Sequence, residues 1–395
     1  MRFGILFLLS LLATAASGEK PWPRHTIDPV DAATSRAGAD GVRLGYLNAD
    51  TLPDIVTGWE EGNAIRAYLN PGPEKAKNPW PAVTVGKVKN AEDAVFADVD
   101  GDGWLDVVSS CEGKTKSHFV HWAPVSAKEL LTESSWKTEV IPVTKGIEAW
   151  MYTLPCDVDG DGDVDLITGS KNEGASVSWI ENPGKDASRD LSLWKLHRIA
   201  DAGWIMSLRI LEQDGQRYLV FSDRKGAHSG IFITPFANEA PYFGKPILIG
   251  GGGEEVMFLD LALLDDDGKI DVVASIRPDK TRVIYQPEDP LTIWEDSADL
   301  ELLDQNTFGS TKAVKVGLID DDQIPDFVIT CERAQGKLKG VLLSNVFSEF
   351  EAISDSEGVK YDRIELLDLD DDGDLDIITC EERAGLGVFW FENPR

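Results

Sequence analysis

The chain has 395 residues, of which 42% are hydrophobic, and its formal net charge at pH 7 is −31. A hydrophobic fraction of this size, together with 12 tryptophans, is typical of a folded protein and argues against a disordered chain. The negative charge repels phosphate backbones and anionic lipid, so we expect neither nucleic acid nor a membrane surface as a partner.

Residues 1–18 have the pattern of a secretory signal peptide. Arg2 precedes an apolar run from Phe3 to Leu12, and small residues follow from Ala13 to Gly18. The run is too short to span a bilayer, and no later stretch is long and apolar enough to do so. We therefore expect a soluble, monomeric protein, secreted or periplasmic, whose residues 19–395 form a single domain.

The chain contains four cysteines. They are Cys111, Cys156, Cys331 and Cys380. An even number of cysteines in an exported protein permits two disulfides, and the spacing leaves their pairing open.

An acidic loop recurs along the chain at a nearly constant period. Aligned on the last acid of the loop, seven copies place equivalent residues at Asp54, Asp106, Asp165, Tyr218, Asp271, Asp326 and Asp376, which are 50 to 59 residues apart. Each copy has an apolar run, the loop, a β-branched run and a third run that ends in Asn-Pro or Pro. A fourth run, which often begins with Trp, follows. Four short strands punctuated by Gly, Pro and Asn predict a four-stranded antiparallel sheet.

Seven such sheets bury both of their faces when they stack radially, which predicts an all-β, seven-bladed β-propeller. The last copy ends at Arg395, directly after its third strand. The N-terminal run WPRHTI (22–27) matches the fourth-strand run WKLHRI (194–199) at Trp, His and Ile. We therefore predict that residues 22–27 form the outer strand of blade 7 and close the ring, which also protects a sheet edge.

The alternating acids of the loops suit a hard cation. Crowded carboxylates repel one another, and Ca²⁺ takes six to eight oxygen ligands, which converts this repulsion into binding. Three loops are complete: Asp98, Asp100, Asp102 and Asp106; Asp157, Asp159, Asp161 and Asp165; and Asp368, Asp370, Asp372 and Asp376. Three are partial: Asn48, Asp50 and Asp54; Asp265, Asp267 and Asp271; and Asp320, Asp322 and Asp326. The fourth copy is degenerate, with Ile210, Glu212, Asp214 and Tyr218 at these positions.

These loops predict several structural Ca²⁺ sites, with Mg²⁺ as the second choice. The alternative is a set of tight polar turns whose acids hold no metal. In their strand context the loops resemble the FG-GAP/VCBS repeats of the integrin α-subunit N-terminal propeller. The D-x-D-x-D-G-x-x-D loop is the specific part of this resemblance, which extends over nearly all of the mature chain. The resemblance implies a seven-bladed propeller with Ca²⁺ in the loop that joins the first two strands of a blade.

The connections on the opposite face carry mixed charges and tryptophan. These residues are Trp59, Glu60, Glu61, Lys171, Asn172, Glu173, Arg224, Lys225, His228, Glu332, Arg333, Glu381, Glu382 and Arg383. Near the entrance of the inner strands lie Glu92, Asp93, Glu148, Trp150, Trp204, Glu254 and Glu255. Such a surface suits a sugar or peptide ligand. Alternatively, it is a solvated rim whose tryptophans pack between blades.

The sequence leaves two functions open. The first is a non-catalytic, Ca²⁺-stabilised binding or adhesion module for a glycan or protein outside the cytoplasm. We assign it no catalytic or cofactor-binding residues, because neither a nucleophile elbow nor a phosphate loop is present. The second is an exported polysaccharide lyase or glycoside hydrolase with paired acids such as Glu92 and Asp93, or Glu148, at the channel mouth. Acids that converge on the channel together with Arg, Tyr or His would favour the enzyme.

Overall fold

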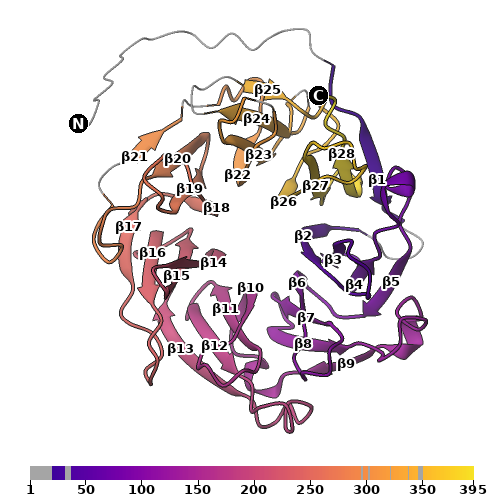
Figure 1. Ribbon diagram of the computed structural model, residues 1–395, viewed down its shortest axis with the longest axis vertical. Coiled ribbons are helices and arrows are strands. Elements are labelled where there is room, and N and C mark those ends of the chain that lie inside the picture. Colours follow the sequence, from indigo (N-terminus) through magenta and orange to yellow (C-terminus); the bar gives the residue numbers. More distant parts are fainter. Residues whose placement is uncertain are drawn as a thin grey trace.

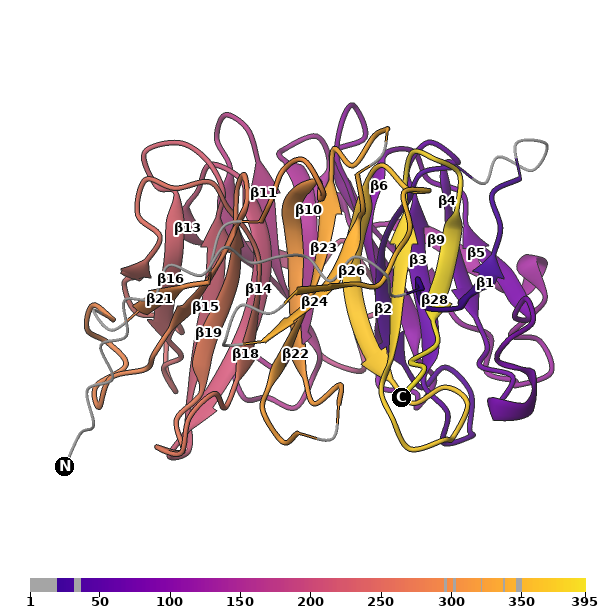
Figure 2. The same cartoon turned by 90° about the horizontal axis from the view of Figure 1, so that it is seen from above.

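The computed structural model describes residues 20–31, 37–294, 297–300, 303–320, 322–336, 338–345 and 350–395. The predicted signal peptide, residues 1–18, lies outside the described residues. Seven four-stranded antiparallel sheets are arranged in a ring around one axis (Figure 1), as the repeat predicts. Figure 2 shows the ring from the side, with the strands running between its two faces.

The first strand of each blade lies nearest the axis, and the following strands lie progressively further out (Figure 1). Blade 1 contains β2 (Ala39–Gly45), β3 (Asp54–Trp59), β4 (Ala64–Tyr68) and β5 (Ala82–Gly86). Blade 2 contains β6 (Ala91–Ala97), β7 (Asp106–Cys111), β8 (Ser117–Trp122) and β9 (Lys137–Val140). Blade 3 contains β10 (Ala149–Cys156), β11 (Asp165–Lys171), β12 (Ser176–Glu181) and β13 (Lys195–Asp201).

The remaining blades repeat this order. Blade 4 contains β14 (Ile205–Gln213), β15 (Gln216–Asp223), β16 (Gly230–Pro235) and β17 (Ile247–Gly250). Blade 5 contains β18 (Val256–Ala262), β19 (Asp271–Ile276), β20 (Lys280–Ile284) and β21 (Ser297–Asp299). Blade 6 contains β22 (Ser310–Gly317), β23 (Asp326–Glu332), β24 (Val341–Asn345) and β25 (Phe350–Ala352). Blade 7 contains β26 (Tyr361–Leu367), β27 (Asp376–Glu381), β28 (Gly387–Phe391) and β1 (Arg24–Asp28).

The helices of the described part of the chain are short 3-10 turns, at η2 (Pro73–Lys75), η3 (Glu133–Ser135) and η4 (Pro142–Thr144). None of these helices has the length and apolar character needed to cross a bilayer.

The N-terminal strand closes the ring, as the sequence predicts. β1 pairs antiparallel with β28 and becomes the fourth strand of blade 7. His25 Nε2 lies 2.6 Å from a carboxylate oxygen of Glu392, and His197 Nε2 lies 2.6 Å from one of Glu181. The two histidines therefore occupy equivalent positions on the outer strands of blades 7 and 3.

The core lies between the blades, where the β-branched second strands pack. β7 is buried along its whole length, because neighbouring blades cover both of its faces. Trp59 and Trp150 are also fully buried and donate their indole N–H groups to the Tyr68 hydroxyl and the Thr144 carbonyl. These two tryptophans therefore pack in the core, as the alternative interpretation of the rim predicts, and they cannot contact a ligand.

The four cysteines form no disulfide. Cys111, Cys331 and Cys380 are buried in the second strands of blades 2, 6 and 7, and Cys156 is half-buried at the end of β10. Burial raises the pKa of the Cys111 thiol to about 12. The four cysteines therefore occupy separate positions, three of them in the core.

Charged side chains meet at the axis. Asp93 of β6 accepts hydrogen bonds from Arg43 of β2 at 3.0 Å and from Arg363 of β26 at 2.7 Å. Both guanidinium groups lie over the Tyr152 ring of β10, at 4.1 and 4.3 Å from its centroid. Because blade 1 lies between blades 7 and 2, the Arg363–Asp93 bond spans blade 1. Together these contacts link four inner strands.

Candidate functional site

All the acidic loops lie on one face of the ring, because each joins the first strand of a blade to the second. In two complete loops three carboxylates come together, with one oxygen from each within 4.8 Å of the others. These groups are Asp98, Asp100 and Asp102, and Asp157, Asp159 and Asp165. The glycine after the third acid donates its N–H to the first acid, from Gly103 to Asp98 at 3.0 Å and from Gly162 to Asp157 at 3.2 Å. Both glycines have φ of 93°, a conformation that side chains disfavour.

In several blades the last acid of the loop also hydrogen-bonds to two parts of its hairpin. Asp165 is 1% exposed and accepts the N–H of Val158 in the loop at 3.0 Å and that of Asn182 after the third strand at 2.7 Å. Asp54 and Asp376 make the equivalent pairs of bonds. Burial raises the pKa of Asp165 to about 7. The sequence pattern did not show this second role, because the bonds depend on how the third strand returns.

Blade 4 replaces the acidic loop with a two-residue hairpin. β14 and β15 are joined by Asp214 and Gly215, whose φ angles are 51° and 77°. Two successive positive φ angles are typical of a type I′ turn, for which Asp-Gly is a preferred sequence. The degenerate fourth copy therefore keeps the hairpin but lacks the cluster of alternating carboxylates.

The complete loops have the donors that a hard cation requires. Their ligands are carboxylate oxygens, and Oδ1 of Asp370 and Oδ1 of Asp374 are buried without a hydrogen-bond partner. Lys77 of blade 1 lies 3.0 Å from Asp370, and Arg189 of blade 3 contacts Asp100. These basic side chains from the next blade reduce the negative charge of two loops.

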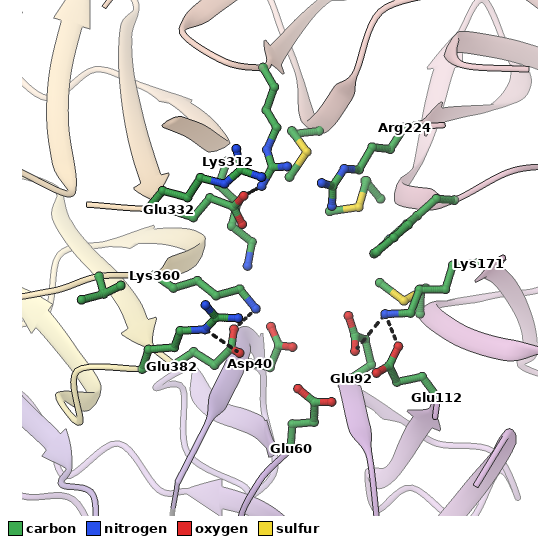
Figure 3. A pocket seen from close by; sticks show the side chains of 18 of the residues that line it. Asp40, Glu60, Glu92, Glu112, Lys171, Arg224, Lys312, Glu332, Lys360 and Glu382 are labelled. Atoms are coloured by element: carbon green, nitrogen blue, oxygen red, sulfur yellow. Dashed lines mark ion pairs between the residues drawn. The ribbon is translucent and has the colours of Figure 1, made fainter. Parts of the chain in front are cut away.

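A pocket of about 590 Å³ lies on the opposite face, where the inner strands begin (Figure 3). All seven blades contribute to its lining. The lining residues are Asp40, Glu60, Glu61, Glu92, Glu112, Met151, Lys171, Trp204, Met206, Arg224, Met257, Arg277, Lys312, Glu332, Arg333, Gln335, Val359, Lys360, Glu382 and Arg383.

Breaks in strand register aim side chains into this pocket. Near the start of every inner strand, its pairing with the second strand of the blade shifts by at least one residue. In four blades this shift leaves one residue unpaired between paired neighbours: Glu92, Met151, Met206 and Lys312. A β-bulge of this kind redirects a side chain, and bulges are frequent beside functional sites. Met257 lies in the corresponding break of β18. The chain has four methionines, and three of them line the pocket through this position.

Carboxylates gather on the wall formed by blades 1 and 2. Asp40, Glu60 and Glu92 each offer an oxygen within 4.8 Å of the others. Burial, with Glu92 and Glu112 nearby, raises the pKa of Glu60 to about 7. Burial and Asp362 likewise raise the pKa of Asp40 well above its usual range. The carboxylates of this wall outnumber the basic side chains beside them.

Arginines gather on the wall formed by blades 4, 5 and 6. Arg277 pairs with Glu255 at 3.0 Å and also contacts Glu332. Burial and the charge of Arg224 lower the pKa of Arg277 to about 10. The like charges therefore repel one another on this wall as well.

Residues 46–109 match a family described as the FG-GAP-like repeat. They contain the partial loop of blade 1 and the complete loop of blade 2. The chain contains an FG-GAP-like repeat. This agrees with the resemblance drawn from the loops and with the seven-bladed fold.

Solved structures resemble this propeller in fold alone. One is BBS1N in complex with ARL6DN, which is 8% identical, covers 94% of this chain and 98% of its own, and has a TM-score of 0.51. Another is Saccharomyces cerevisiae Sqt1, which is 13% identical, covers 91% of this chain and 97% of its own, and has a TM-score of 0.53. No curated protein sequence matches the chain.

Ten of the residues expected on the face opposite the loops line the pocket. They are Glu60, Glu61, Glu92, Lys171, Trp204, Arg224, Glu332, Arg333, Glu382 and Arg383. Others have structural partners: Glu148 bonds to Ser170 and Ser176, and Glu381 accepts backbone N–H groups such as that of Ala384. Glu254 pairs with Lys280 at 2.6 Å. Asn172, Glu173, Lys225 and His228 are not among the lining residues.

Sequence reasoning missed Asp40, Glu112, Arg277, Lys312, Lys360 and the three methionines. One signal was available for the methionines, since they stand near the start of the inner strand in three consecutive repeats. The lysines and Arg277 offered no such signal, because charged residues are common throughout the chain.

Proposed function

We propose that this FG-GAP-like propeller is a Ca²⁺-stabilised binding module that acts outside the cytoplasm, secreted or periplasmic. Its ligand, a glycan or a protein, binds in the central pocket. The observation that carries the proposal is the pocket itself, which gathers charged side chains from all seven blades on the face free of acidic loops. The signal-peptide pattern of residues 1–18 supports export.

A rigid pocket favours binding, because its side chains lose little conformational entropy when the ligand binds. Here ion pairs hold the lining side chains: Lys171 contacts Glu112, and Lys360 contacts Glu382. Trp204 lies among Lys171 and Arg224, with their charged groups 4.5 and 4.6 Å from its ring centroid. The closed ring fixes these groups relative to one another.

Calcium has a structural role in this proposal. Asp98, Asp100 and Asp102 would hold it in blade 2, Asp157, Asp159 and Asp165 in blade 3, and Asp368, Asp370 and Asp372 in blade 7. The carboxylate groupings and the unpartnered oxygen of Asp370 support the sites. Bound metal stabilises the hairpins, since its binding free energy adds to that of folding.

A glycan array probed with the mature protein, with and without Ca²⁺, tests the proposal. We expect binding that Glu60→Gln weakens at least tenfold, whereas Glu173→Gln on the same face, outside the pocket lining, leaves it unchanged. A pull-down with immobilised protein partners covers the second ligand class. If Glu60→Gln leaves the affinity unchanged, the ligand binds elsewhere and the assignment to the pocket is wrong.

One observation favours an enzyme as the second candidate. Acids and arginines converge on the axis, and Glu60, with a pKa of about 7, is suited to general acid catalysis. Asp40 and Glu92 lie beside it as candidate partners. Turnover of a polysaccharide that Glu60→Gln abolishes would replace the binding module with a lyase or hydrolase.

A further inference from the structure

The two charged walls of the pocket are not neutralised by each other. On the acidic wall Glu60 and Glu61 have no ion-pair partner among the described residues, and Glu92 reaches Lys171 only at 3.8 Å. On the basic wall Glu255 pairs with both Arg224 and Arg277, and Glu332 contacts Arg277. Arg333 has no ion-pair partner in the described ranges. Each wall therefore carries an excess of one sign.

Figure 3 shows how this excess is arranged. Asp40, Glu60 and Glu92 lie on one side of the opening, with Lys171 and Lys360 beside them. Arg224 and Lys312 lie on the other side, with Glu332 beside Lys312. Five of the seven lining acids come from blades 1 and 2, and three of the four lining arginines come from blades 4, 5 and 6. The exceptions are Glu332 of blade 6 and Glu382 and Arg383 of blade 7. The raised pKa of Glu60 and the lowered pKa of Arg277 agree with repulsion inside each wall. A single ion of either sign would satisfy one wall only.

Three methionines form an apolar part of the pocket lining. Met151, Met206 and Met257 lie on the inner strands of blades 3, 4 and 5, next to the arginine-bearing connections of blades 4 and 5. A smaller second recess is lined by Met151, Met206, Ile205 and Phe258 together with the charged residues Asp40, Glu92, Lys312, Asp362 and Arg363. Methionine side chains are flexible and polarizable, so they adapt to apolar groups of varied shape. A hydrated metal ion would gain nothing from this lining.

We infer that the central pocket binds a short zwitterionic peptide, with its ammonium group at Asp40, Glu60 and Glu92 and its carboxylate at Arg224 and Arg333. The three methionines receive its side chains. The inference rests on the proposed function, because it takes the pocket as the binding site and names its ligand. A volume of about 590 Å³ is within the usual range for small-molecule pockets.

This ligand neutralises both walls at once. Charge-assisted hydrogen bonds to the ammonium and carboxylate groups are stronger than those between neutral groups, and the arginine fork suits a carboxylate. Removal of either terminal charge leaves one wall unsatisfied. Affinity should therefore require both charges and should fall as salt screens them.

The test is calorimetric titration of the mature protein with the tripeptide Ala-Leu-Ala in four forms. These are the free peptide, its N-acetyl form, its C-terminal amide and the doubly blocked peptide. We expect the free peptide to bind at least tenfold more tightly than either singly blocked form, and the doubly blocked form not to bind. A chelator should leave the affinity unchanged, since the acidic loops lie on the other face.

Two variants assign the charges to the walls. Glu60→Gln should weaken the free and amidated peptides but not the N-acetyl peptide. Arg333→Gln should weaken the free and N-acetyl peptides but not the amide. Glu173→Gln, exposed and outside the lining, is the matched control. Thermal melting of each variant separates loss of binding from loss of fold.

Several results would overturn the inference: no binding of the free peptide, equal binding of the doubly blocked form, or loss of binding on chelation. The proposed function fails separately. A glycan or protein that binds in a Glu60-dependent manner while the peptides do not would refute the zwitterion and keep the binding module. If the free peptide binds and no glycan or protein does, the inference is supported. The function is then the binding of short peptides.

Discussion

Arg363 Nη1 of blade 7 donates to Asp93 Oδ1 of blade 2 at 2.7 Å, across 270 residues of sequence. Arg43 of blade 1 binds the second oxygen of the same carboxylate. These two arginines lower the pKa of Asp93, although its burial acts in the opposite direction. The pair therefore connects the end of the chain to its second repeat inside the ring.

Asp93→Asn should destabilise the propeller. The substitution leaves the buried Arg363 and the half-buried Arg43 without their counter-charge. Breaking one side of a buried ion pair typically costs ~3–5 kcal/mol. Urea denaturation followed by far-UV circular dichroism measures the change. Asp201→Asn, which removes the exposed pair with Arg198, is the control and should change stability by less than ~1 kcal/mol. Equal effects of the two variants would contradict the network.

Deletion of residues 19–28 should sharply lower the melting temperature. The deletion removes β1 and leaves β28 as an open edge in blade 7. A synthetic peptide of residues 19–31, added in excess, should restore much of the lost stability, because it supplies the missing strand. Unchanged melting of the truncated chain would show that closure does not depend on β1.

Removal of Ca²⁺ with a chelator should lower the melting temperature, and excess Ca²⁺ should restore it. At a free ligand concentration of 100 times Kd, one site adds about 2.7 kcal/mol to the free energy of unfolding. Asp159→Asn should reduce this dependence, because it weakens the loop of blade 3. Asp214→Asn, in the two-residue turn of blade 4, should leave it intact. A chelator without effect on the wild-type protein would argue against bound metal.

Acidification should destabilise the fold through two buried histidines. Burial lowers the pKa of His118 and of His121 to about 3 each, from an unfolded value near 6.5. Groups with a depressed folded pKa contribute stability above the unfolded pKa. That stability is lost as the pH falls from about 6.5 towards 3, because the unfolded chain binds the protons first.

The variant His121→Gln tests this pH dependence. The imidazole bonds to Ser109 and Thr138 at 2.9 Å each, so the variant should be less stable at pH 7 by ~1–3 kcal/mol. Its free energy of unfolding should also fall less steeply between pH 6.5 and 4 than that of the wild type. Parallel pH profiles would show that His121 does not titrate between the two states.

Much of the fold could be predicted because the repeat is local. The Asp-Gly turns, the β-branched runs and the Pro-terminated runs lie within each copy, and together they specify a four-stranded sheet. The match of His25 to His197 identified the closing strand, since both histidines meet a glutamate at the same register. The residues of the acidic loops were equally visible, because their carboxylates are close together in the sequence.

Only part of the pocket could be predicted from the sequence, because its lining depends on the register between the first and second strands of each blade. Glu60, Arg224 and Arg333 follow directly from the strand ends, whereas Met151 and Lys312 reach the pocket through breaks in strand pairing. Trp59 looked like a ligand-binding residue and proved to be core. Sequence spacing distinguishes neither case, because both outcomes depend on contacts between blades.

The sequence by itself determined the seven blades, their order and the acidic loops, since these arise from short-range patterns repeated along the chain. Only the tertiary structure decided which charges meet. Asp93 and Arg363 become partners, and Glu60 and Arg333 face one pocket, because ring closure brings distant repeats to a common axis.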